Sequence, residues 1–207
     1  MKSTIKWFVC AVCSGVLVAG CAGGTKLTHT NMDETYRGKP VSNILVIGVT
    51  YKEKEEVRRS FEDQFVAQLK AAGVEAIASG DAISIPEDMK LKKDTILKAV
   101  NQFNNDAVVI THLIGKEEKE AYTRSDRGPS GYYSYYGWAY GHSHTPDYLS
   151  TNTTVRLATN LYDVKTEKRI WSGESQTLKA GSVDQVIDDV IKLVIQDLQI
   201  NGLLPKN

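Results

Sequence analysis

The chain has 207 residues and no net charge at pH 7, because 25 lysines and arginines balance 25 aspartates and glutamates. This length suits one domain whose core needs neither disulfide nor metal. The balanced charge gives no electrostatic reason to expect nucleic-acid binding.

The amino terminus has the pattern of a secretory leader. Lys2 and Lys6 precede an apolar run from Trp7 to Val18, which is long enough for a signal-peptide core and too short to cross a bilayer. The run ends in Val-Ala-Gly followed by Cys21, a sequence that resembles the lipobox of bacterial lipoproteins. The resemblance implies a signal peptide over residues 1–20, a thioether-linked lipid on Cys21, and an acyl chain such as palmitate on the new amino terminus. The alternative is that Cys21 is an ordinary cysteine behind an ordinary cleavage site.

The leader also bears on the compartment. By resemblance to enterobacterial sorting, Ala22 in place of aspartate implies the outer membrane, with the domain on the periplasmic side and surface exposure left open. Cys10 and Cys13 leave with the leader, so no intrachain disulfide is possible. Residues 21–42 contain glycines, a proline and few large apolar side chains, and we expect a lipidated Cys21 followed by a flexible tether.

A single domain is expected over residues 43–207, with one shared core formed by Ile44, Val46, Phe61, Phe65, Val108, Ile110, Leu157, Leu161, Val186, Val190 and Val194. Continuous apolar runs indicate strands covered on both faces, and apolar residues every four positions indicate an amphipathic helix. Two strand–helix–strand crossovers in succession imply parallel pairing. The elements expected in this half are strands at 43–50, 74–78 and 106–115, with helices at 55–72 and 94–103.

The second half has a different pattern. An aromatic and glycine-rich insert spans about residues 116–150. Alternating side chains over 152–163 and a second run over 169–176 predict an antiparallel hairpin. Ser182 and Gln185 form a capping box for a final helix that ends at Gly202.

The expected order is therefore β-α-β-α-β-β-β-α. We predict an α/β fold with α+β character in its second half, in which helices pack on a mixed sheet. The lipobox, the strands NILVIGVT and DAVVITHLIG, the phrase LYDVKTEKRIWSGE and the closing helix carry a resemblance to small envelope lipoproteins. The chain resembles the LpoB-type activators of penicillin-binding proteins, the CsgG-like secretion lipoproteins and the amino-terminal domain of TolB. That resemblance implies an accessory role in envelope assembly, cell-wall synthesis or secretion.

The aromatic insert is the predicted contact surface. Tyrosine and tryptophan dominate binding hot spots, and the glycines between them argue against a regular buried element. The partner would be another envelope protein or peptidoglycan. The alternative is that the rings fold back as a lid on the sheet. The residues concerned are Tyr132, Tyr133, Tyr135, Tyr136, Trp138 and Tyr140.

Histidines provide the only candidates for metal chemistry. His142 and His144 would project to one face of an extended segment, with Asp147 as a third ligand, and the alternative is a solvated polar loop. His112 lies inside an apolar strand, where a hydrogen-bonded core histidine is the more common case. We therefore expect a non-enzymatic interaction protein with no cofactor beyond the lipid on Cys21. A metal-binding protein or metal-assisted enzyme is the alternative.

Overall fold

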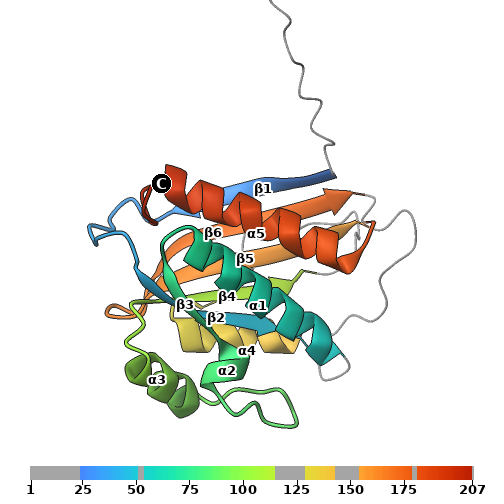
Figure 1. The fold of residues 1–207 in the computed structure, drawn as a ribbon. Coiled ribbons are helices and arrows are strands. Elements are labelled where there is room, and N and C mark those ends of the chain that lie inside the picture. The colour runs from blue at the N-terminus through green and yellow to red at the C-terminus, as the bar shows by residue number, and fades with distance from the viewer. Residues whose placement is uncertain (1–23, 51–53, 115–128, 143–153, 179–180, 207) are drawn as a thin grey trace, which may run out of the picture.

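The computed structural model describes residues 24–50, 54–114, 129–142, 154–178 and 181–206, with Gly141 and His142 described by their backbone alone. Its centre is one six-stranded sheet with the strand order β1-β6-β5-β4-β2-β3 (Figure 1). The strands are β1 (Gly24–Met32), β2 (Asn43–Val49), β3 (Glu75–Ala78), β4 (Ala107–Leu113), β5 (Val155–Asp163) and β6 (Arg169–Leu178).

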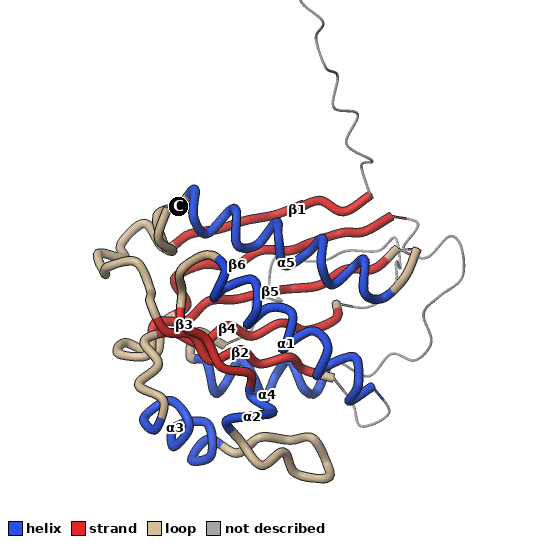
Figure 2. Tube along the Cα trace, viewed as in Figure 1, coloured by secondary structure: helices blue, strands red, loops and turns tan. Residues whose placement is uncertain are grey.

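Helices cover both faces of this sheet. Figure 2 shows α1 and α5 crossing the front, while α4 lies behind β2 and β4. None of the described helices is both long and apolar enough to pass through a membrane. The helices are α1 (Glu55–Ala71), α2 (Ser79–Ala82), α3 (Lys93–Gln102), α4 (Tyr132–His142) and α5 (Val183–Ile200).

The pairing is mixed, as the sequence predicts. β2 is parallel to both β3 and β4, because the helices between them carry the chain back to the same end of the sheet. The β4–β5, β5–β6 and β6–β1 pairs are antiparallel. The predicted α/β fold, with parallel crossovers followed by an antiparallel hairpin, is confirmed.

The apolar residues form two cores, one on each side of the sheet. Val46 and Val109 point to the front, where they join Phe65 of α1 and Val190 of α5. The intervening Val108 points to the rear, because side chains alternate along a strand. An expectation of one shared core is therefore wrong for the rear-facing residues of β4, Val108 and Ile110.

The tether expected over residues 22–42 is wrong for residues 24–32. These residues form β1, which pairs with β6 from Gly24 opposite Leu178 to Met32 opposite Trp171. The strand is mostly polar and partly exposed, which suits a sheet edge whose front face meets α5. The outer edge of the predicted hairpin is consequently covered by β1.

Close packing in β6 explains one short motif of the sequence. The indole of Trp171 is buried and lies across Gly173, where an added Cβ would come within 2.3 Å of the ring. The indole N–H donates to Asp197 Oδ2 at 2.8 Å. Glycine is therefore needed two residues after the tryptophan for the ring to reach the α5 helix.

Candidate partner-binding surface

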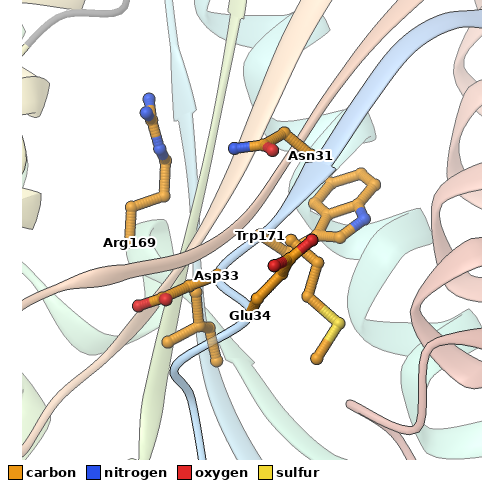
Figure 3. Close-up of a pocket in the computed structure, with 7 residues that line it drawn as sticks. Asn31, Asp33, Glu34, Arg169 and Trp171 are labelled. Atoms are coloured by element: carbon orange, nitrogen blue, oxygen red, sulfur yellow. The ribbon is translucent and has the colours of Figure 1, made fainter.

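A shallow polar cavity of about 380 Å³ lies where β1 ends and β6 begins. Figure 3 shows the side chains of Asn31, Asp33, Glu34 and Arg169 gathered around the two strands, with the Trp171 indole beside them. Met32 and Ile170 complete the lining. The cavity adjoins β1, the edge strand of the sheet, so a partner could contact both.

The turn after β1 holds the acidic side of this cavity in place. The Asp33 backbone N–H donates to the Ile170 carbonyl at 2.9 Å, which continues the sheet past Met32. The Thr35 hydroxyl and backbone N–H donate to Asp33 Oδ1 at 2.6 and 2.8 Å. These two hydrogen bonds lower the pKa of Asp33, so the carboxylate is ionised at neutral pH.

The opposite charge comes from the start of β6. Arg169 is half-buried, and its Nη1 donates to Asn160 Oδ1 at 3.5 Å. Asn31 and Glu34 are exposed, and Figure 3 shows Glu34 beside the Trp171 indole, with Arg169 on the other side of the strands. Fixed charges of both signs next to amide groups suit polar contacts with a protein surface or with sugar hydroxyls. Such a shallow polar site differs from the mostly apolar clefts that bury small ligands.

A second cluster of charged residues lies buried between α1 and the ends of β2 and β3. Arg58 and Glu62 are 3% and 0% exposed and form an ion pair at 3.0 Å. Glu62 Oε1 accepts from the Gly48 backbone N–H at 2.9 Å and from the Ser79 hydroxyl at 2.7 Å. Glu62 Oε2 accepts from the Gly80 backbone N–H at 3.0 Å as well as from Arg58.

This cluster lies at the carboxyl ends of the parallel strands, where open α/β sheets bind ligands. The Gly48 and Gly80 N–H groups, the Ser79 hydroxyl and Arg58 Nη1 all bind the Glu62 carboxylate, whereas Arg58 Nε has no hydrogen-bond partner in the described part of the chain. The protein's own carboxylate therefore takes the position that a bound anion takes in nucleotide-binding folds. The arrangement stabilises the α1–sheet junction and offers no vacant anion site among these donors.

His112 lies on the rear face and is a core residue. It is 3% exposed, and its Nδ1 is 3.1 Å from the Tyr135 hydroxyl. The Tyr135 and Trp138 rings both meet the imidazole edge-on, with centroids 5.7 and 5.5 Å away. The expectation of a hydrogen-bonded core histidine is confirmed.

The aromatic residues of the insert form the helix α4, so the expected absence of a regular buried element is wrong. Tyr132, Tyr135 and Tyr136 are 1–2% exposed and pack on the rear core, which makes them unavailable to a partner in this structure. The Tyr136 hydroxyl donates to the Met89 carbonyl at 2.8 Å and accepts from the Leu91 N–H at 3.0 Å. The structure therefore has the lid arrangement. The remaining predicted contact residues, Tyr133, Trp138 and Tyr140, are only partly buried.

Other predicted sites lie outside the described residues. These are Cys21, His144 and Asp147, together with the side chain of His142. Within the described part of the chain, no group of three or more histidine, cysteine or acidic residues is placed to hold a metal ion.

Comparison with known proteins yields structural similarities only. No protein family matches the chain, and no curated protein matches it. The chain is similar to the PelC dodecamer of Paraburkholderia phytofirmans, with 11% identity, 88% of this chain and 99% of that chain covered, and a TM-score of 0.48. It is also similar to lipoprotein GNA1162 of Neisseria meningitidis, with 16% identity, 77% and 99% covered, and a TM-score of 0.42. At these identities the similarity concerns the path of the chain and assigns no function.

Two structural features, the aromatic helix and the buried ion pair, were not predicted although the sequence contains a signal for each. Tyr132, Tyr135, Tyr136 and Ala139 recur at the spacing of one helix face, and all four are buried. The Arg58–Glu62 pair has helical spacing on the inner side of α1. The polar cavity gave no such signal, because its residues come from two strands more than 130 positions apart.

Proposed function

We propose that this protein is a non-enzymatic, lipid-anchored accessory protein of the bacterial envelope. It is attached to the outer membrane through Cys21 and faces the periplasm. The observation that carries the proposal is the lipobox-like leader placed directly before a folded domain, whose first strand begins three residues after Cys21. The domain uses no cofactor other than the lipid.

The buried polar groups support a role in binding rather than in catalysis. Glu62 has four hydrogen-bond donors within the protein, and His112 is enclosed by aromatic rings. Both groups therefore serve the fold. The polar cavity formed by Asn31, Asp33, Glu34 and Arg169, with the adjoining edge of β1, is the proposed contact surface for an envelope protein or peptidoglycan.

The anchor is tested by mass spectrometry of the amino-terminal peptide from the membrane fraction of a Gram-negative host. A lipidated Cys21 is expected, and Cys21→Ser should release the protein from the membrane. An unmodified Cys21 in the membrane-extracted protein would refute the anchor.

The contact surface is tested by placing a photo-crosslinking amino acid at Asn31 in living cells, with the same group at Ile200 as the control. Asn31 is exposed and Ile200 is 67% exposed, so both positions accept the probe. We expect the probe at position 31 to form adducts with one defined envelope component. These adducts should disappear in the Arg169→Glu variant. Equal adducts at position 200, or adducts unaffected by Arg169→Glu, would place the contact elsewhere.

A further inference from the structure

The end of the sheet where β1 begins carries an exposed apolar side chain beside the anchor. Gly24 pairs with Leu178, the last residue of β6. The two are so close that a Cβ on Gly24 would come within 2.7 Å of the Leu178 carbonyl oxygen. Leu178 is 45% exposed, and Ile200 is the other large apolar residue exposed in the described part of the chain.

The chain between the anchor and this end is very short. Only Ala22 and Gly23 separate Cys21 from Gly24. An extended chain advances at most about 3.6 Å per residue, so Gly24 lies within roughly 11 Å of the lipidated residue. The reach of the tether is thus similar to the thickness of the headgroup layer, which spans several ångströms on each side of the hydrocarbon core.

We propose that this end of the domain, with Leu178 at its tip, rests in the lipid headgroup layer. This inference rests on the proposed lipidation of Cys21. The short tether brings Leu178 to the bilayer, and burial of an exposed apolar side chain in the interface is favourable. The exposed Lys26, two residues into β1, is placed to meet anionic headgroups.

This orientation determines where the α5 helix and the polar cavity lie relative to the membrane. The first half of the α5 helix lies near the anchored end, because the Thr25 hydroxyl donates to Asp189 Oδ2 at 3.1 Å. The helix rises about 1.5 Å per residue from Asp189 to its last residue, so Ile200 lies roughly 16 Å further along it. The polar cavity is at the far end of β1, beside Met32 and Asp33. The polar cavity of the proposed contact surface therefore lies away from the membrane, and Figure 1 shows the start of β1 and the end of α5 at opposite sides of the domain.

The test uses the full lipidated chain in vesicles of phosphatidylethanolamine and phosphatidylglycerol that carry a quencher on the acyl chains. A fluorophore is attached to Leu178→Cys in one sample and to Ile200→Cys in the matched control. Both positions are exposed, so neither change disturbs the core. Quenching of roughly twofold or more is expected at position 178 and none at position 200.

Mass spectrometry of the same samples separates the two proposals. If the protein is lipidated but the label at position 178 is quenched no more than the label at position 200, the membrane contact is refuted and the proposed function is unaffected. Self-quenching between labels at position 178, without quenching by the lipid, shows a second copy at this end and also overturns the contact. Protein without lipid on Cys21 refutes both.

Discussion

The substitution Glu62→Leu tests whether the buried ion pair stabilises the junction between α1 and the sheet. Leucine keeps most of the side-chain volume but cannot accept a hydrogen bond. The change deprives the Arg58 guanidinium, the Ser79 hydroxyl and the backbone N–H groups of Gly48 and Gly80 of their shared acceptor.

The expected effect follows from the burial of this pair. Arg58 is 3% exposed, so without Glu62 its charge would remain buried, with the exposed Glu55 at 3.6 Å as its remaining ion-pair partner among the described residues. Removing one partner of a buried pair costs about 3–5 kcal/mol. For a domain of this size, that loss lowers Tm by roughly 6–20 °C. Arg58→Met combined with Glu62→Leu should recover part of the loss, because no lone charge is left inside.

Urea unfolding followed by far-ultraviolet circular dichroism measures these free energies. The Lys192–Asp188 pair is the matched control, since it has the same helical spacing at 2.7 Å but side chains that are 65% and 41% exposed. Lys192→Met should leave the unfolding midpoint nearly unchanged. If Glu62→Leu unfolds at the same midpoint as Lys192→Met, the buried cluster does not stabilise the fold and the reasoning fails.

Three further predictions concern the aromatic residues. Tyr136→Phe leaves the buried Leu91 N–H without its acceptor and should lower the unfolding free energy by about 1–3 kcal/mol in the same urea assay. An unchanged unfolding midpoint would show that water reaches this N–H group. Burial raises the pKa values of Tyr136 and Tyr162 above the ordinary value of 10.0. Their contribution to stability is therefore complete below about pH 10 and lost as the pH rises further, because the unfolded state releases these protons first. Tm measured between pH 8 and pH 11 should fall across the alkaline part of this range, and a constant Tm would contradict the burial. Gly173→Ala forces the Trp171 ring to move, which should lower the unfolding free energy by about 1–3 kcal/mol and change the near-ultraviolet circular dichroism spectrum. A spectrum and Tm like those of the parent protein would show that the ring can accommodate the added methyl group.

The aromatic helix shows how local reasoning from the sequence fails. The glycines suggested an irregular exposed loop, yet Gly137 lies on the exposed side of α4, where a missing side chain costs only helix propensity. The tyrosines are buried because the rear faces of β2 and β4 need a cover, which the sequence of the insert does not reveal.

What the sequence determined by itself is the set of elements with strong apolar periodicity. The strands β2 and β4 and the helices α1 and α5 were predicted because their side chains repeat at the period of the element that buries them. The predicted N-cap is also confirmed, since the Ser182 hydroxyl accepts from the Gln185 N–H at 3.1 Å.

Tertiary structure alone decided the rest. Residues 24–32 have little apolar character, and they form a strand only because β6 presents an open edge to them. The division into two cores depends on which helix reaches which face. The polar cavity exists because β1 and β6, distant in sequence, are neighbours in the sheet. Each of these outcomes depends on contacts between distant segments, which local periodicity does not encode.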